Sequence, residues 1–163
     1  MSRPPGWSGV RALVTDVDGV LTDGGLYYGE HGDELKRFDV RDGQGLVLLR
    51  EAGVLVAIVT RKQSSIVSRR AQDLGITEVH QSSTDKAAVV TALLARHDIP
   101  PHAAAYIGDD VGDIPAMKLV GLPIAVKEAV PPVRRAAHYV TKAGGGHGAI
   151  REIADLILAA RKR

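Results

Sequence analysis

The hydrophobic positions of this chain form short apolar runs that are separated by longer stretches of mixed polarity. Apolar or β-branched runs bounded by turn residues are typical of strands buried in a sheet. Six such runs predict strands; they cover residues 10–15, 54–59, 78–80, 103–107, 122–126 and 138–141. Each is short enough for one strand, and none is long enough for a membrane-spanning helix.

Helical patterns occupy the stretches between most of these runs. Apolar residues spaced three or four apart, with Gly53 and Gly75 as C-terminal signals, predict helices. The predicted helices cover residues 46–52, led in by 41–43, then 65–74, 86–97 and 148–160, with Thr84 or Asp85 as the cap of the third. Strands that alternate with helices predict a mainly parallel sheet with right-handed crossovers and helices on both faces. The expected fold class is therefore α/β, a three-layer α/β/α Rossmann-like domain.

Residues 24–40 depart from this alternation and predict a β-hairpin insertion. Two extended segments, 24–28 and 34–40, flank the glycine-containing loop 29–33. A lone two-stranded ribbon cannot cover the apolar and aromatic side chains of such a segment. Those side chains are Leu26, Tyr27, Tyr28, Leu35 and Phe38. Another copy of the protein could cover them, and no inserted segment is long enough to form a cap domain.

Composition narrows the class of protein. The chain has 163 residues, of which 45% are hydrophobic and 25% charged, which suits one packed domain over residues 1–163. The net charge is only +2, and the sequence has no cluster of basic residues with interleaved aromatic residues. We therefore expect no nucleic-acid partner. The chain contains no cysteine, and its start lacks an apolar signal core. We expect a cytoplasmic protein without a membrane partner.

Candidate chemistry gathers where the predicted strands end. Asp16 and Asp18 follow the first run, Thr60 follows the second, and Lys86 starts a helix, whereas Asp109, Asp110 and Asp113 follow the run 103–107. The carboxyl ends of parallel strands lie on one edge of a sheet, so these side chains should share one crevice. Crowded carboxylates repel one another and offer the hard oxygen ligands that Mg²⁺ accepts. The sequence therefore predicts a magnesium site.

This set of groups predicts phosphoryl transfer. A carboxylate beside Mg²⁺ can attack phosphorus, while a second carboxyl protonates the leaving oxygen and then deprotonates water. Lys86 and the Thr60 hydroxyl can hold the phosphoryl oxygens as charge redistributes.

The four motifs, in this order and on these elements, resemble the haloacid dehalogenase superfamily of phosphotransferases. That resemblance implies Asp16 as the nucleophile and Asp18 as the general acid/base, which also gives its backbone carbonyl to Mg²⁺. It implies Thr60 and Lys86 as the phosphate-binding pair, and Asp109, with Asp16 and Asp18, as a metal ligand. For Asp110 a simpler interpretation stays open, since a second acid can cap the helix that follows.

A closer resemblance covers nearly the whole chain. Residues 16–24, the hairpin, residues 36–43, residues 106–110 and the glycine-rich 144–148 are similar to the capless phosphatases of 3-deoxy-D-manno-octulosonate 8-phosphate and of acylneuraminate 9-phosphates. That family implies homotetramers joined through the hairpins, with a neighbouring subunit over the active site. It also implies a substrate site, beside Asp18 and Lys86, that contains Val40, Arg41, Asp42, Gly43 and Arg70. A solvated helix face is the alternative for Arg70.

The chain also departs from this subfamily. The octulosonate phosphatases usually carry Thr-Gly-Arg-Lys after the second strand, whereas here the loop is Thr60-Arg61-Lys62-Gln63, and Val47 stands where many have a basic residue. The expected activity is thus Mg²⁺-dependent hydrolysis of a 2-keto-3-deoxy sugar acid phosphate, through an aspartyl-phosphate, with the sugar left open. Lys36, Arg41, Arg70 and Lys86 could supply positive charge for its phosphate and carboxylate.

The rival from another class is a phosphoaspartate signalling receiver domain, which also combines acids, Mg²⁺, a hydroxyl and a lysine. A receiver would carry its phosphoacceptor aspartate after the third strand of its sheet. The comparable strand ends here offer Thr60 and His80, and the hairpin has no place in that scheme. Another small sugar phosphate as substrate is the nearer alternative.

Overall fold

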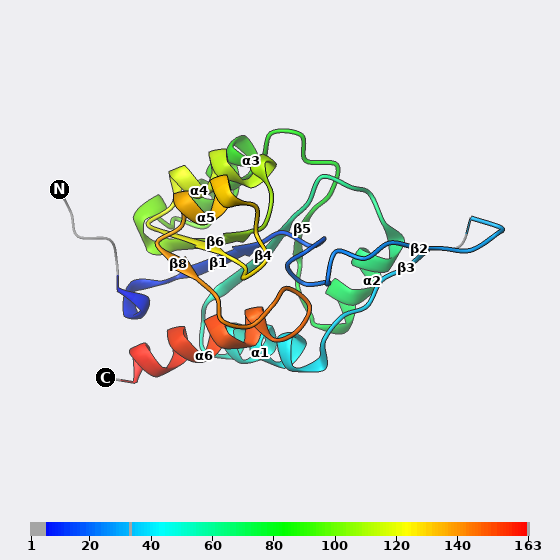
Figure 1. Cartoon of the computed structure of the whole chain (residues 1–163). Helices are drawn as coiled ribbons and strands as arrows, with labels where there is room; N and C mark the ends of the chain where they lie inside the picture. The colour runs from blue at the N-terminus through cyan, green and yellow to red at the C-terminus, as the bar shows by residue number, and fades with distance from the viewer. Residues whose placement is uncertain (1–5, 33, 163) are drawn as a thin grey trace.

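A six-stranded sheet forms the centre of the computed structural model, which describes residues 6–32 and 34–162 (Figure 1). The strand order is β5-β4-β1-β6-β7-β8, and all of the pairings within it are parallel. The strands are β1 (Ala12–Thr15), β4 (Leu55–Val59), β5 (Glu78–His80), β6 (Ala104–Gly108), β7 (Leu122–Ala125) and β8 (Tyr139–Val140). The predicted α/β class is confirmed, and each strand lies within the run that predicted it or within one residue of it.

Helices cover both faces of this sheet (Figure 1). One face carries α1 (Val40–Glu51), α2 (Ser65–Asp73) and α6 (Ala149–Arg161), and the other carries α3 (Lys86–Arg96), α4 (Ile114–Leu119) and α5 (Pro131–Ala136). Three short 3-10 helices, η1 (Trp7–Gly9), η2 (Pro101–Ala103) and η3 (Val111–Asp113), lie in the connections. Strand β1 lies at the centre of the sheet and is fully buried between the two helical layers.

The observed helix ends agree with the sequence prediction for α3 but not for the start of α1. Asp85 caps α3 by accepting a hydrogen bond from the Ala88 amide at 3.0 Å, as expected. The prediction for α1 was wrong at its start, because the helix begins at Val40 and not after Gly43. Asp39 caps it and accepts from the Arg41 amide at 2.7 Å. Residues 40–43 are therefore the first turn of a helix.

Two short helices, α4 and α5, were not predicted from the hydrophobic pattern. Each has six residues and proline in its first turn. A helix of that length is too short to display a full amphipathic repeat, although proline at its start is a recognised signal.

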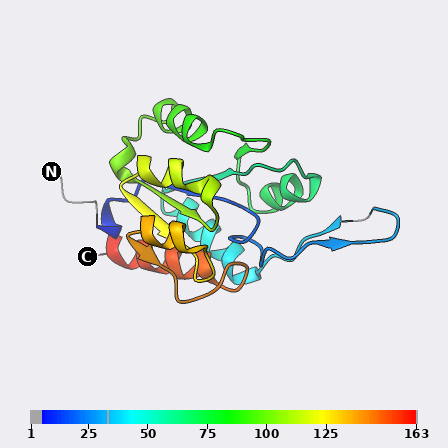
Figure 2. The ribbon, with the colours of Figure 1, turned by 45° about the horizontal axis from the view of Figure 1, so that its top comes forward.

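The hairpin extends away from the rest of the molecule (Figures 1 and 2). Its strands β2 (Tyr27–Tyr28) and β3 (Glu34–Leu35) are antiparallel and shorter than the extended segments predicted. Its apolar side chains are not covered within the chain, since Leu26 is 46% exposed, Tyr27 47%, Tyr28 71% and Leu35 66%. Within the described residues no inserted domain covers the sheet edge, and no helix is both long and apolar enough to cross a membrane.

A carboxylate network fastens the edge strand β5 to the end of α3. Glu78 accepts hydrogen bonds from His80 at 2.8 Å, from Arg96 at 2.8 Å and from His97 at 2.7 Å. Burial alone would raise the pKa of Glu78, but the hydrogen bonds from the two histidines and the Arg96 charge outweigh it and lower the pKa from 4.5 to about 2. Because the folded pKa is depressed, this contribution to stability is present above pH 4.5 and is lost as pH falls toward 2.

We therefore expect Glu78→Gln to lower the free energy of unfolding at pH 7 by about 1 to 2 kcal/mol, and by less at pH 3.5. Urea denaturation at both pH values measures the difference. Glu51→Gln, which changes an exposed glutamate on α1, is the matched control and should be neutral at both. An equal loss from Glu78→Gln at pH 7 and pH 3.5 would contradict the assigned role of the charge.

Candidate active site

The loop that follows β1 is folded into a tight turn by its own hydroxyl group. Thr22 Oγ1 accepts hydrogen bonds from the amides of Gly19 and Gly24, both at 3.2 Å. Gly19 has φ +85°, and a Cβ atom at this position would collide with the Asp109 carboxylate. Glycine is therefore required here both by the backbone angle and by the close approach of Asp109.

The glycine-rich loop before α6 supports this turn from outside. The Gly146 amide donates to the Val20 carbonyl at 3.0 Å, and the Gly145 amide donates to Glu128 Oε2 at 3.1 Å. A Cβ atom at Gly145 would overlap the Gly19 carbonyl, so the two loops are in direct backbone contact. Residues singled out by resemblance alone thus have a clear structural role, which is to position the aspartate loop.

The loops at the carboxyl edge of the sheet line one cavity of about 350 Å³. It contains all the residues predicted to carry the chemistry: Asp16, Asp18, Thr60, Lys86 and Asp109. Arg61, Lys62 and the segment 110–113 complete its wall, together with Gly24. The parallel sheet therefore brings together side chains from four separate parts of the sequence, as expected for this architecture.

Asp113, which the sequence placed in this crevice without assigning it a role, is a buried residue of the cavity wall. Its Oδ1 accepts from the Lys86 ammonium at 2.8 Å and from the Tyr106 hydroxyl at 2.6 Å. Its Oδ2 accepts from the amides of Asp109 at 3.0 Å and Asp110 at 3.2 Å. The sequence signal was the spacing of Asp113 three residues after Asp110, which forms a capping box with it.

Lys86 bridges two buried carboxylates, since its ammonium also lies 3.1 Å from Asp16 Oδ2. Burial would lower the pKa of Lys86, but the charges of Asp16 and Asp113 outweigh it and raise the pKa above 10.5, so the side chain stays charged. Burial, followed by the charge of Asp113, raises the pKa of Asp16 from 3.8 to about 6 against the opposing effect of Lys86. Asp16 also accepts from the Val17 amide at 2.7 Å.

Asp109 shows why a divalent cation fits this site. Its carboxylate accepts no hydrogen bond from the described residues, although oxygens of Asp16, Asp109 and Asp113 lie within 4.8 Å of one another. Burial, and then the charges of Asp16 and Asp113, raise the pKa of Asp109 from 3.8 to about 8. Asp113 already accepts from four donors, so Asp16 and Asp109 are the carboxylates available to a hard cation such as Mg²⁺.

Asp18 occupies a different environment on the hairpin side of the cavity. Its Oδ1 accepts from the Lys36 ammonium at 2.8 Å, and the same ammonium lies 3.0 Å from Glu34 Oε1. Burial would lower the pKa of Lys36, but its hydrogen bonds to Asp18 and Glu34 outweigh this and raise the pKa above 10.5. Asp110 is exposed and caps η3 by accepting from the Val111 amide at 2.7 Å, which supports the simpler interpretation of this residue.

The segment predicted to bind substrate lies outside this cavity. Asp42 is buried and accepts from the amides of Gly148 at 3.3 Å and Arg151 at 3.0 Å, so it joins α1 to α6. Arg41 pairs with Asp39 at 3.1 Å, and Val40 is 83% exposed. Gly43 packs against the Arg70 guanidinium. The substrate role of residues 40–43 stays a prediction.

Arg70 lines a neighbouring cleft of about 370 Å³. Its guanidinium carbon lies 5.5 Å from the centre of the Phe38 ring, and its Nη2 donates to the Asp39 carbonyl at 3.4 Å. The other lining residues are Lys36, Phe38, Val40, Ile66, Arg69 and Asp73. Because Lys36 lies between this cleft and Asp18, the cleft adjoins the acidic cavity without being part of it.

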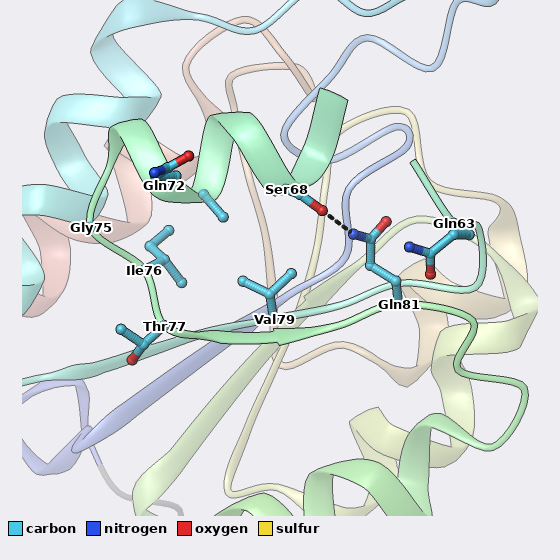
Figure 3. Close-up of a pocket in the computed structure, with 9 residues that line it drawn as sticks. Gln63, Ser68, Gln72, Gly75, Ile76, Thr77, Val79 and Gln81 are labelled. Atoms are coloured by element: carbon cyan, nitrogen blue, oxygen red, sulfur yellow. Dashed lines mark hydrogen bonds between the residues drawn. The ribbon is translucent and has the colours of Figure 1, made fainter. Parts of the chain in front are cut away.

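A further cavity, of about 480 Å³, opens between α2 and β5 (Figure 3). The side chains around it are neutral, and Gln81 donates to Ser68 Oγ at 2.8 Å across it. With no charged group in its lining, this cavity offers nothing that phosphate chemistry needs.

Comparison with known proteins agrees with this geometry. A family model described as haloacid dehalogenase-like hydrolase matches residues 55–153. The 3-deoxy-D-manno-octulosonate 8-phosphate phosphatase of Yersinia pestis is 46% identical over 154 residues, which are 94% of this chain and 82% of that protein. The enzyme of the same name from Escherichia coli K12 is 44% identical over 93% of this chain and 81% of its own length.

Solved structures give the same result. The crystal structure of the Yersinia pestis phosphatase superposes with a TM-score of 0.94, covering 96% of this chain and 84% of that one. The phosphatase of Moraxella catarrhalis, solved with a magnesium ion, a phosphate ion and a KDO molecule, is 38% identical. It has a TM-score of 0.93 and covers 96% of this chain and 90% of that one.

The hydrogen bonds of Asp113 predict how the substitution Asp113→Asn changes the stability of the protein. Asp113→Asn replaces one acceptor oxygen by an NH₂ group that must face two hydrogen-bond donors in a buried position. We expect the free energy of unfolding, measured by urea denaturation, to fall by about 3 kcal/mol.

Asp110→Asn is the matched control, because asparagine also caps a helix, and it should change the free energy of unfolding by less than about 0.5 kcal/mol. Equal stability of Asp113→Asn and the wild type would show that Asp113 does not hold the site together.

Proposed function

Because the chain belongs to the haloacid dehalogenase-like hydrolases, we propose that its substrate is 3-deoxy-D-manno-octulosonate 8-phosphate. The chain is a phosphoric monoester hydrolase with Mg²⁺ as its cofactor. The observation that carries the proposal is a complete set of phosphoryl-transfer groups in one cavity, in a chain 46% identical to a phosphatase of that name. Acylneuraminate 9-phosphates are the alternative sugar acids and form part of the test below.

The reaction uses the two carboxyl groups of the aspartate loop in different ways. Asp16 attacks phosphorus and forms an aspartyl-phosphate, while the protonated Asp18 gives its proton to the leaving sugar oxygen. Asp18 then takes a proton from the water that hydrolyses the intermediate. The carboxylates of Asp16 and Asp109 and the backbone carbonyl of Asp18 would hold Mg²⁺, which supplies charge stabilisation for the phosphoryl oxygens when bound.

Lys86 and Thr60 stabilise the transferred group from the chain itself. Lys86 is held by Asp16 and Asp113, so its ammonium is already oriented and needs little reorganisation during transfer. The Thr60 side chain is buried to 2% exposure, lines the cavity and provides a hydroxyl donor at the end of β4. A receiver domain does not fit this arrangement, because the candidate phosphoacceptor Asp16 follows β1 and not the third strand.

The substrate carboxylate should bind to cationic side chains that are not already paired with an aspartate or glutamate of the protein. Lys36, Arg41 and Lys86 are each paired with aspartate. Arg61 and Lys62 line the cavity, are exposed, and make no salt bridge within the part of the chain that the structure describes. They and Arg70 of the adjoining cleft are therefore the proposed carboxylate ligands.

The working unit is a homo-oligomer, a tetramer by family resemblance, built from single-domain subunits that meet through their hairpins. The support is the exposed apolar surface of Leu26, Tyr27, Tyr28 and Leu35 on a ribbon that extends away from the rest of the molecule. Pairing of hairpins between subunits would bury these side chains and satisfy their exposed strand edges.

A substrate panel tests the proposed activity. We expect kcat/KM in the presence of Mg²⁺ to be highest for 3-deoxy-D-manno-octulosonate 8-phosphate, at least about 10-fold above glucose 6-phosphate, because one extra charge-assisted contact is worth about 1.5 kcal/mol or more. Acylneuraminate 9-phosphates are the third class of substrate tested. Asp16→Asn, which lacks the nucleophile, is the control for background hydrolysis. A higher kcat/KM for an acylneuraminate 9-phosphate would show that the proposed sugar is wrong. Equal kcat/KM values for all three substrates would contradict recognition of the substrate carboxylate.

The double variant Leu26→Asp with Leu35→Asp tests the oligomer. Repulsion between like charges should dissociate hairpins that pair across subunits, and sedimentation velocity should change from a tetramer to a monomer. Thr91→Asp with His102→Asp, which adds the same charge at exposed polar positions outside the hairpin, should leave the tetramer intact. A wild-type protein that sediments as a monomer at assay concentration would contradict the proposal.

A further inference from the structure

Lys36 is a buried cation whose two carboxylate partners both belong to the hairpin side of the cavity. It follows β3 directly, and its side chain is 2% exposed. Its ammonium lies 2.8 Å from Asp18 Oδ1 and 3.0 Å from Glu34 Oε1. Because the ammonium contacts two carboxylates at once, these partners hold it in place.

The Asp18 carboxyl group has no other fixed contact. Its side chain is 30% exposed, and among the described residues only Lys36 donates a hydrogen bond to it, at Oδ1. The second oxygen, Oδ2, accepts no hydrogen bond from these residues, and Asp18 lines the cavity. The rotation of the carboxyl group is therefore set by the ammonium, which occupies one oxygen and leaves the other for proton transfer.

We propose that Lys36 is the positioning residue for general acid/base catalysis by Asp18. Lys36 holds Oδ1, so that Oδ2 is the oxygen left to donate and accept the proton. That proton passes to the leaving oxygen as the bond between this oxygen and phosphorus breaks and the bond from phosphorus to Asp16 forms. In the second half, Oδ2 takes one proton from the attacking water. This inference rests on the proposed role of Asp18, and it does not depend on which sugar acid is the substrate.

Two observations favour positioning over binding of a substrate anion. The ammonium already contacts two carboxylates, so it offers little unpaired charge to a third anion. The neighbouring Arg37 fastens the same segment to the glycine-rich loop, since its Nη1 donates to the Gly146 carbonyl at 2.6 Å. Anchoring of the hairpin and orientation of Asp18 are thus carried by different residues, which allows them to be separated by mutation.

A series of substituted phenyl phosphates with leaving groups of graded pKa separates proton donation from sugar recognition. We compare kcat/KM, which reports cleavage of the bond between phosphorus and the leaving oxygen, for the wild type, Lys36→Met, Lys36→Arg and Arg37→Met. A nitrophenolate leaves without a proton, whereas phenolate and less acidic alcohols need the general acid. Lys36→Met should therefore lose at least about 10-fold on phenyl phosphate and less than about 3-fold on 4-nitrophenyl phosphate.

The controls decide what such a result means. Lys36→Arg, which can still donate to Oδ1, should recover the wild-type slope of log kcat/KM against leaving-group pKa, and Arg37→Met should keep that slope. An equal loss by Lys36→Met on every phosphate would overturn the proposal, and so would the same slope change in Arg37→Met. A wild-type slope in Asp18→Asn would overturn the general acid assignment beneath it, while the sugar panel would still report the proposed substrate independently.

Discussion

The four hydrogen bonds accepted by Asp113 fix the geometry on which the rest of the site depends. Through Oδ2 this carboxylate sets the backbone of Asp109 and Asp110, and through Oδ1 it holds Lys86 over Asp16. Asp113 is held by four donors, whereas burial and the neighbouring charges raise the pKa values of Asp16 and Asp109. Asp113 thereby holds the site in place, whereas Asp16 and Asp109 remain available to a cation.

This division explains which parts of the site the sequence could predict. Strand ends in a parallel sheet meet at one edge, so Asp16, Thr60 and Asp109 could be placed together from the pattern of apolar runs. From the sequence, Asp113 is only one more acid after a strand, because its role depends on a buried tyrosine and two amides that no local pattern indicates. The role of Lys36 at Asp18 was equally hidden, since it follows from how the hairpin leaves the domain.

The pattern of apolar runs also made the fold predictable, and the errors of that prediction have physical causes. Short apolar runs predicted the strands, and helical spacing with glycine stops predicted the longer helices, whereas α4 and α5 are too short to show a repeat. The start of α1 was misplaced because residues 41–43 were interpreted as leading into the helix, although Asp39 caps the helix and Gly43 and Gly45 are buried in it. Gly43 lies against Arg70 and Gly45 against α6, so close packing and not flexibility requires them.

The hairpin leaves its apolar side chains exposed, and it also carries Lys36, which contacts the proposed general acid, Asp18. Among the described residues, its two strands share the pairs Tyr27 with Leu35 and Tyr28 with Glu34, which specify register weakly. A slip of one residue would turn Lys36 to the opposite face and away from Asp18, because side chains alternate along a strand. The bridge between Thr22 and Phe38, at the base of the hairpin, opposes such a slip. A partner that covered the exposed tip would oppose it from the other end, so assembly and proton transfer would depend on the same register.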